Sequence, residues 1–229
     1  KYRNNGQTCV CANRIYVQSG VYDAFAAKLT AAVDKLRVGD GFADGVTTGP
    51  LITEKAVEKV EEHIQDVLAG GGKVVTGGQS DDGGGFFIRP TIVRDVTDGD
   101  RIVDEEQFGP VLPILKVETF QEALDFITAR PHPLAAYLFT DRPRFHRAFE
   151  EQVQAGAVCT DVTLLHAGIT TLPFGGIGAS GMGAYHGETG FETFSHMRPS
   201  LAKTDQVDTL KVAYPPYTWF KRKALPKML

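Results

Sequence analysis

Apolar residues follow two alternating spacings along the first 162 residues, and this alternation predicts the fold class. Runs of branched and aromatic residues predict strands, whereas apolar residues three or four positions apart predict helices. The predicted strands are residues 11–18, 73–76, 86–96, 111–118, 135–140 and 156–162, and the predicted helices are residues 21–39, 53–68, 120–129 and 142–154. Because strands and helices alternate, we expect an α/β domain with a largely parallel sheet flanked by helices.

Individual residues refine this pattern. Thr53 is a plausible cap for the helix that follows it, and Pro90 places the strand 86–96 at an edge or a bulge of its sheet. A turn rich in Gly and Asp, residues 79–85, precedes that strand. After Leu172 the pattern changes to a glycine-rich loop, a short aromatic segment and a basic tail.

Composition excludes several classes of function. The 229 residues are 42% hydrophobic and 23% charged, which suffices for one sizeable core or two small domains. The net charge of -4 gives no sign of a basic face, so nucleic acid is not an expected partner. No apolar run approaches the roughly 18 residues of a membrane span, and the first residues lack the apolar stretch of a signal peptide. Since the chain begins with Lys1 rather than Met, we expect that the true start has been removed.

The cysteines indicate the compartment. An odd number of them, Cys9, Cys11 and Cys159, argues against a disulfide framework and for a reducing, cytoplasmic location. No pair has the C-x-x-C spacing and the histidines are scattered, so we expect no zinc or iron site.

The strongest chemical signal is NNGQTC, residues 4–9. A glycine-containing turn followed by Cys9 leaves the sulfur reachable, and a thiolate is a good nucleophile for a carbonyl carbon. The backbone N–H of Cys9 can help to hold the oxyanion that develops. The alternative is that Cys9 is a small buried hydrophobic residue, the usual fate of a free cysteine.

Two further motifs fit a ligand site. EEQFGP, residues 105–110, fits a turn that presents a carboxylate and an aromatic ring to a ligand, although a capping acid and a core Phe fit equally well. LPFGGIGASGMG, residues 172–183, has backbone that can approach a ligand closely. Its Gly176, Gly178 and Gly181 match G-x-G-x-x-G, but no strand leads in and no helix follows, so we reject a dinucleotide phosphate site there.

Taken together, the three motifs resemble the aldehyde dehydrogenase superfamily. Up to about residue 94 the chain resembles succinate-semialdehyde dehydrogenases, and from about residue 105 it resembles the class 3 and fatty aldehyde dehydrogenases. The resemblance implies a catalytic domain at 1–200 and a C-terminal tail at 201–229. It also implies that the N-terminal dinucleotide-binding domain, the general-base glutamate and the oxyanion-hole asparagine all precede Lys1 and are absent.

The resemblance assigns roles to residues. Cys9 is the nucleophile, Glu106 hydrogen-bonds the nicotinamide ribose, and Phe108 packs near the nicotinamide. Asn4 and Gln7 shape the nucleophile loop on the substrate side.

Three positions bear on specificity and regulation. Arg3 matches the position where succinate-semialdehyde enzymes hold the distal carboxylate, and an arginine fork suits that task. A surface or interdomain arginine is the alternative. Cys11 matches a second cysteine used as a redox partner by some semialdehyde dehydrogenases, although neighbours two apart on a strand point to opposite faces and buried filler is favoured. Thr160 stands where the family usually has Asn, which puts one contact in doubt.

The expected reaction is oxidation of an aldehyde to a carboxylate with NAD or NADP, through a thiohemiacetal and a thioester on Cys9. A semialdehyde with a distal carboxylate is the first choice of substrate, and a longer apolar or aromatic aldehyde is the second. Two alternatives stay open: a catalytically silent binding or assembly module, and slow thioesterase or esterase chemistry at Cys9.

Association is also expected. The faces around residues 4–9 and 106–108 are normally covered in the family, so their exposure predicts a homo-oligomer. The basic, aromatic tail 210–229 fits subunit packing or solvent better than a membrane surface, and we expect no stable membrane anchor.

Overall fold

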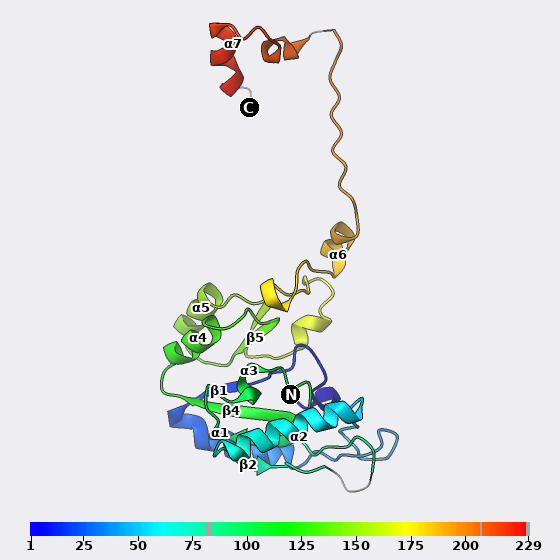
Figure 1. Ribbon diagram of the computed structural model, residues 1–229, viewed down its shortest axis with the longest axis vertical. Helices are drawn as coiled ribbons and strands as arrows, with labels where there is room; N and C mark the ends of the chain where they lie inside the picture. The colour runs from blue at the N-terminus through cyan, green and yellow to red at the C-terminus, as the bar shows by residue number, and fades with distance from the viewer. Residues whose placement is uncertain (81–83, 207, 228–229) are drawn as a thin grey trace. The chain divides into compact units, whose positions relative to one another are not determined.

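The computed structural model describes residues 1–80, 84–206 and 208–227. The predicted turn at 79–85 lies partly outside these residues. The chain divides into two compact units, Lys1–Phe194 and Ser195–Leu229 (Figure 1). The roles predicted for residues 1–200 and for the tail after them stay predictions.

A four-stranded sheet forms the centre of the first unit. Its order is β1, β4, β3, β2, with parallel pairing of β4 to both neighbours and antiparallel pairing of β2 to β3. The bounds are β1 Ile15–Gln18, β2 Lys73–Thr76, β3 Thr91–Arg94 and β4 Val111–Val117. The predicted α/β fold with a largely parallel sheet is confirmed, with β2 as its antiparallel edge.

Pro90 does not mark an edge or a bulge within its own strand, so that prediction was wrong. β3 begins one residue after Pro90 and lies between β4 and β2. The missing N–H of Pro90 therefore falls before the hydrogen-bonded ladder, where it costs no bond to a neighbouring strand.

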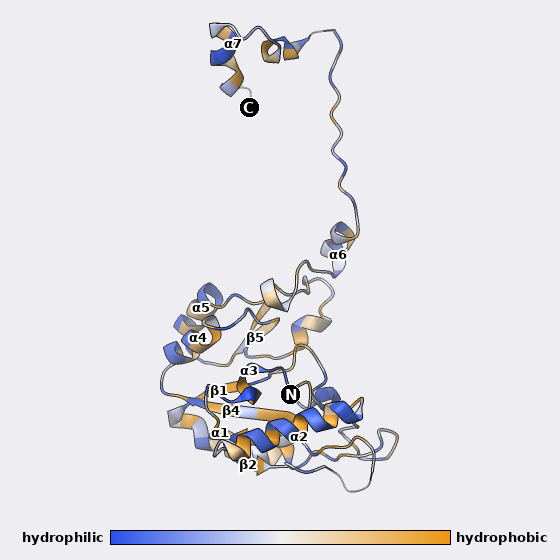
Figure 2. Cartoon of the chain, viewed as in Figure 1, coloured by the Kyte–Doolittle hydropathy of each residue, from blue (hydrophilic) through white to orange (hydrophobic). Residues whose placement is uncertain are grey.

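Helices cover both faces of this sheet. α1 (Tyr22–Val33) packs on one face through Tyr22, Ala26 and Val33, against Val17, Ile92 and Ile114. α2 (Glu54–Ala69) packs on the other through Val60, Ile64 and Val67, against Val93, Val111 and Leu115. Figure 2 shows α2 with a hydrophobic and a hydrophilic side, whereas β4 is largely hydrophobic. Neighbouring β4 residues thus enter different cores, as expected for a strand buried on both faces.

The helix α2 begins where the sequence predicts. The hydroxyl of Thr53 accepts a hydrogen bond from the backbone N–H of Ala56 at 3.2 Å. This satisfies one of the four free N–H groups of the first turn, so the predicted cap is confirmed.

The last two predicted strands form a sheet of their own. β5 (Ala135–Leu138) pairs in parallel with β6 (Ala157–Thr160). α4 (Phe120–Thr128) and α5 (Pro143–Gln152) pack beside it, with Leu124, Ala136, Phe149 and Val153 as a third core. The sequence predicts each strand but not this separation, because hydrophobic spacing fixes which face is buried and leaves the pairing partner open.

Two short helices of the first unit were not predicted. α3 (Arg101–Asp104) leads into the EEQFGP motif, and α6 (Gly187–Thr193) follows the glycine-rich loop. Both are too short to show a helical period.

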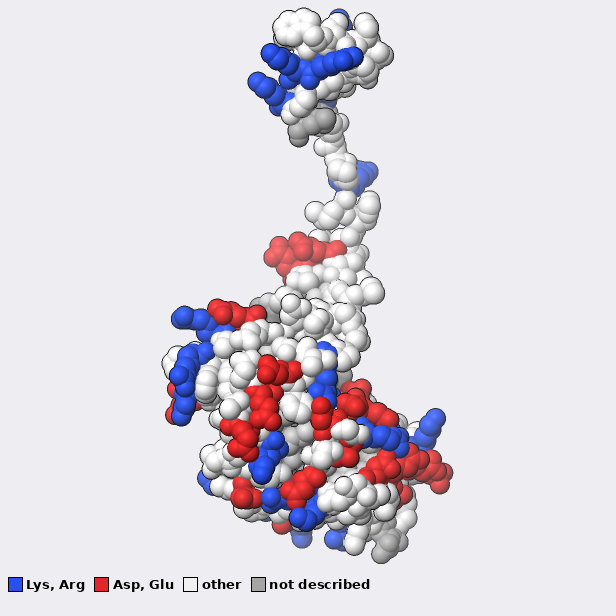
Figure 3. Space-filling model, turned by 60° about the vertical axis from the view of Figure 1, so that its left-hand side comes forward, with Lys and Arg blue, Asp and Glu red and all other residues white. Residues whose placement is uncertain are grey.

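The second unit, Ser195–Leu229, holds α7 (Trp219–Ala224) between two 3-10 turns, Thr209–Ala213 and Leu225–Lys227. Its large side chains are exposed, Trp219 and Phe220 among them. Lys221, Arg222 and Lys223 form the last turn of α7, and Figure 3 shows positive charge gathered there. Over the described part of the chain, no helix has the length and apolar character needed to cross a membrane.

Candidate functional site

The Cys9 loop, residues 3–11, has an unusual backbone. Asn4, Asn5 and Gly6 are all left-handed, with φ of 50°, 55° and 76°. Asn and Gly tolerate this region better than other residues do, which explains the run NNG. A turn then closes as the N–H of Cys11 donates to the carbonyl of Thr8 at 2.9 Å, and Cys9 lies exposed within that turn.

The side chains of Asn4 and Gln7 hold the loop together. The Asn4 amide donates to the carbonyl of Gln7 at 2.9 Å, and the Gln7 amide donates back to the carbonyl of Asn4 at 3.2 Å. Gln7 also accepts from the N–H of Ile52 at 2.9 Å and donates to the carbonyl of Pro50 at 3.4 Å. These contacts suit the predicted shaping role, while direct contact with a substrate stays a prediction.

Two glycines bring the Cys9 loop against the turn 105–110. A Cβ added to Gly6 would lie 2.2 Å from the carbonyl oxygen of Gly109, and one added to Gly109 would lie 2.4 Å from a methyl carbon of Val60 on α2. Real Cβ atoms do not approach so closely, so Gly6 lies against the Gly109 backbone, and Gly109 lies against α2, only because neither residue has a side chain. The first two motifs therefore meet in space.

The turn 105–110 alternates between buried and exposed side chains. Gln107 is buried and donates to the carbonyl of Ile102 at 2.5 Å. Glu106 and Phe108 on either side of it are exposed, and Phe108 has a φ of 49° and is 42% exposed. The alternative of a core Phe is therefore wrong: the turn presents both the carboxylate and the ring outward.

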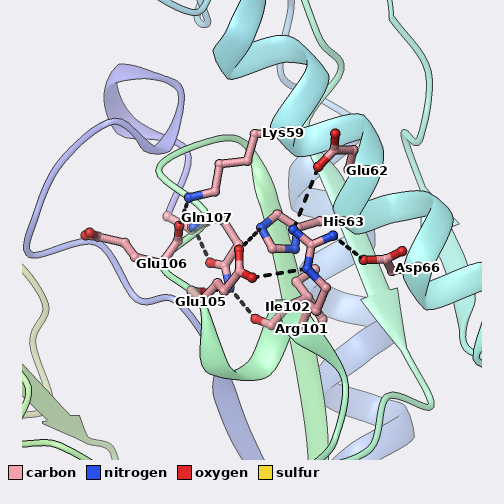
Figure 4. Close-up of polar contacts among 10 residues, drawn as sticks. Lys59, Glu62, His63, Asp66, Arg101, Ile102, Glu105, Glu106 and Gln107 are labelled. Carbon is pink, nitrogen blue, oxygen red and sulfur yellow. Dashed lines mark hydrogen bonds and ion pairs between the residues drawn. The ribbon is translucent and has the colours of Figure 1, made fainter.

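Lys59 of α2 holds this turn in place. Its ammonium donates to the backbone carbonyl of Glu106 at 2.5 Å, which leaves the Glu106 carboxylate free for another partner (Figure 4). Sequence reasoning missed Lys59.

Further along α2, a charged network holds Glu105. Arg101 donates to Glu105 at 3.1 Å and to Asp66 at 2.9 Å, and it lowers the pKa of Glu105 (Figure 4). His63 has 0% exposure and lies 3.7 Å from Glu105. Burial lowers the pKa of His63 and outweighs the opposing attraction of Glu105, so His63 is neutral at pH 7. Positions 59, 62, 63 and 66 repeat at helical spacing, a signal that sequence reasoning did not use.

The glycine-rich motif is a loop closed on itself. Phe174 and Tyr185 exchange backbone hydrogen bonds at 2.9 and 3.0 Å. Gly178–Ser180 forms only a 3-10 turn, and a Cβ on Gly176 would lie 2.1 Å from the carbonyl of Ser180. This lacks the strand and helix of a dinucleotide fingerprint, in line with the rejection of such a site.

The remaining predicted residues lie as follows. Arg3 is exposed, and within the described ranges its guanidinium has no hydrogen-bond or ion-pair partner. Cys11 is buried, with its sulfur 3.5 Å from the carbonyl of Lys1, whereas Cys9 is exposed. Both lie in a turn before β1, which begins only at Ile15, so the prediction that they are neighbours on a strand was wrong. Thr160 ends β6, and the next residue, Asp161, accepts from the N–H of Thr140 at 3.2 Å.

The sequence as a whole decides the family. The model of the aldehyde dehydrogenase family matches residues 1–199. The chain belongs to the aldehyde dehydrogenase family. The Cys9 loop and the turn 105–110 are thus parts of an aldehyde dehydrogenase fold.

Curated aldehyde dehydrogenases resemble this chain over most of its length. It is 46% identical over 199 residues to the glutarate-semialdehyde dehydrogenase of Pseudomonas aeruginosa, covering 86% of this chain and 41% of that protein. It is 45% identical, with the same coverage of both chains, to the NADP(+) succinate-semialdehyde dehydrogenase of Escherichia coli. The chain thus spans about two fifths of the length of the curated relatives it matches.

Solved aldehyde dehydrogenase structures share the fold. A succinate-semialdehyde dehydrogenase from Burkholderia pseudomallei superposes with a TM-score of 0.81 at 42% identity, covering 84% of this chain and 39% of that one. The substrate-bound AldH of Staphylococcus aureus has a TM-score of 0.83 at 32% identity and covers 98% of this chain and 47% of that one.

Proposed function

We propose that this chain carries the thiol nucleophile of an NAD(P)-dependent aldehyde dehydrogenase, with Cys9 as the attacking residue. The observation that carries the proposal is the close approach of Gly6 to Gly109, because it sets an exposed thiol beside a turn that offers a carboxylate and a ring.

The proposed chemistry begins with addition of the Cys9 thiolate to the aldehyde carbon. The carbonyl oxygen takes up the charge and is protonated to give a thiohemiacetal. The turn is closed by the N–H of Cys11, so the N–H of Cys9 is not spent on it and can donate to the developing oxyanion. Loss of hydride from that carbon, together with loss of the hydroxyl proton to solvent, gives a thioester, and water then releases the carboxylate and restores the thiol.

A nicotinamide cofactor fits the turn 105–110. The Glu106 carboxylate attracts the Lys1 ammonium electrostatically but has no hydrogen bond or ion pair within the described residues, and Phe108 is exposed beside it. Glu106 would accept from a ribose hydroxyl, and the Phe108 ring would pack against the nicotinamide. When bound, the cofactor accepts the hydride. Lys59 would keep the Glu106 backbone in place during the reaction.

The proposed substrate is a semialdehyde with a distal carboxylate. The exposed Arg3 guanidinium, three residues before the end of the left-handed run, is free to bind a carboxylate with two parallel hydrogen bonds. The relatives named for glutarate and succinate semialdehydes support this choice. A longer apolar or aromatic aldehyde is the second candidate, since the chain from about residue 105 resembles the class 3 and fatty aldehyde dehydrogenases.

Protection of Cys9 tests the substrate class. Succinate semialdehyde should slow alkylation of Cys9 by iodoacetamide more than butanal does, because only the former has a carboxylate. Arg3→Gln should reduce the ratio of protection by succinate semialdehyde to protection by butanal about tenfold, the size expected for charge-assisted hydrogen bonds. Arg147→Gln, an exposed arginine on α5, is the matched control and should change nothing.

The other outcomes separate the alternatives. Equal protection by both aldehydes, with no effect of Arg3→Gln, would favour the apolar substrate. No protection by either aldehyde would favour a catalytically silent binding or assembly module. Sedimentation over a range of concentrations tests the proposed homo-oligomer, and a monomer at every concentration would contradict it.

A further inference from the structure

A cluster on the second sheet reaches the Cys9 loop. Parallel pairing of β5 with β6 sets Tyr137 directly beside Cys159, so the two side chains share one face. The sulfur of Cys159 lies 3.2 Å from Nδ1 of His166, and both residues are only 8% exposed. Burial raises the pKa of the Cys159 thiol and lowers the pKa of His166, so this pair is neutral.

Ring contacts extend the cluster to the glycine-rich loop. The His166 ring lies between the rings of Tyr137 and Phe174, with centroids 6.1 and 6.0 Å away. Phe174 in turn packs edge-on against Tyr185 at 5.7 Å. Tyr137 is therefore held from two sides, by its strand neighbour Cys159 and by the buried imidazole of His166.

The hydroxyl of Tyr137 donates to the carbonyl of Val10, the residue after Cys9, at 2.7 Å. Chiefly because the side chain is half-buried, the pKa of Tyr137 rises to about 12, so the hydroxyl keeps its proton at any physiological pH. The same peptide unit uses its N–H, that of Cys11, to close the turn onto Thr8 at 2.9 Å. Both polar groups of the Val10–Cys11 peptide are thus satisfied, one within the loop and one from the second sheet.

We infer that Tyr137 is a positioning residue for Cys9: its hydroxyl fixes the turn that sets the direction of the Cys9 thiol and of the Cys9 N–H. The inference rests on the proposed role of Cys9. Alkylation requires only a reachable thiolate. Acylation by an activated ester also requires the correct angle of attack and a donor for the oxyanion. Loss of the Tyr137 hydroxyl should therefore harm acylation selectively.

The test compares two phenylalanine variants of the full chain. Tyr137→Phe removes one hydrogen bond to Val10. Tyr22→Phe is the matched control, since the Tyr22 hydroxyl also donates to a backbone carbonyl, that of Ile114 at 3.0 Å, but lies in the core beneath α1. Rates of Cys9 modification by p-nitrophenyl acetate and by iodoacetamide are measured from pH 6 to 9, with peptide mass spectrometry to locate each adduct.

We expect Tyr137→Phe to slow acylation about threefold to tenfold, the effect of one hydrogen bond, and to change alkylation by less than about twofold across the pH range. Tyr22→Phe should leave the ratio of the two rates unchanged. An unchanged ratio in Tyr137→Phe, whether both rates fall together or neither does, would overturn the role of Tyr137 alone. If the activated ester still acylates the Cys9→Ala variant as it acylates the unmodified chain, this result would instead contradict the proposed function.

Discussion

Cys9 and Cys159 carry the same thiol in opposite surroundings. Cys9 is exposed in a turn whose backbone is held by Gln7, Gly109 and Tyr137. Cys159 is buried in a strand, paired with His166, and burial raises its pKa. The difference teaches that a reactive cysteine needs an accessible sulfur on a fixed backbone, whereas a buried and hydrogen-bonded one acts as packing. The predictions below test this contrast.

The largest effect should come from the contact that fixes the Cys9 backbone. Gly6→Ala places a methyl group on a backbone with φ of +76° and against the Gly109 carbonyl. We expect it to reduce the free energy of unfolding by about 3 kcal/mol or more and to abolish Cys9 acylation. Urea unfolding and intact mass measure the two effects.

The matched control for this change is Gly20→Ala, because a Cβ at Gly20 meets nothing within 4 Å. It should reduce the free energy of unfolding by less than about 1 kcal/mol and leave the acylation of Cys9 unchanged. Equal effects of the two alanines would mean that the Gly6–Gly109 contact does not hold the site.

The second prediction compares how much stability the protein loses when Cys159 or Cys9 is replaced by alanine. Cys159→Ala removes a buried partner of His166 and should reduce the free energy of unfolding by about 1 to 2 kcal/mol, while slowing Cys9 acylation no more than Tyr137→Phe does. Cys9→Ala should cost less than about 0.5 kcal/mol, since Cys9 is exposed. A reversed order of the two costs would contradict the contrast between the sites.

The third prediction concerns pH. Burial lowers the pKa of both His63 and His166 below the ordinary value of 6.5, so the unfolded chain takes up these protons first. Stability should therefore be full above pH 6.5 and decline as the pH falls from there toward the folded pKa values. Urea midpoints from pH 8 to pH 5 measure the decline.

Single variants divide this decline between the two regions. His166→Phe should remove the loss of stability at low pH that comes from the Cys159 cluster. His63→Leu should remove the loss that comes from the Glu105 network. A curve that stays as steep in both variants would show that other groups titrate.

The smallest effect should come from the second unit. Unit 1 contains all three hydrophobic cores together with Cys9 and Cys159. Ending the chain at Phe194 should leave Cys9 acylation within about twofold, because Gln7, Gly109 and Tyr137, which hold the Cys9 loop, all belong to unit 1. A larger loss would assign residues 195–229 a part in the chemistry.

The sequence predicts much of the fold because its signals are local. Thr53 and the stripe of Val60 and Ile64 mark α2, and the residues NNG mark the left-handed run before Cys9. By contrast, the contacts of Gly6 with Gly109, of Lys59 with Glu106 and of Tyr137 with Val10 join distant segments. Such contacts depend on strand pairing and helix placement, which hydrophobic spacing leaves open, so the roles of Lys59 and Tyr137 emerge only from the structure.

The central claim is that Cys9 is a primed nucleophile, and intact-protein mass spectrometry after treatment with an activated ester tests it most directly. The account predicts one adduct that persists in Cys159→Ala and disappears in Cys9→Ala. No adduct at all, or one that survives Cys9→Ala, would contradict it.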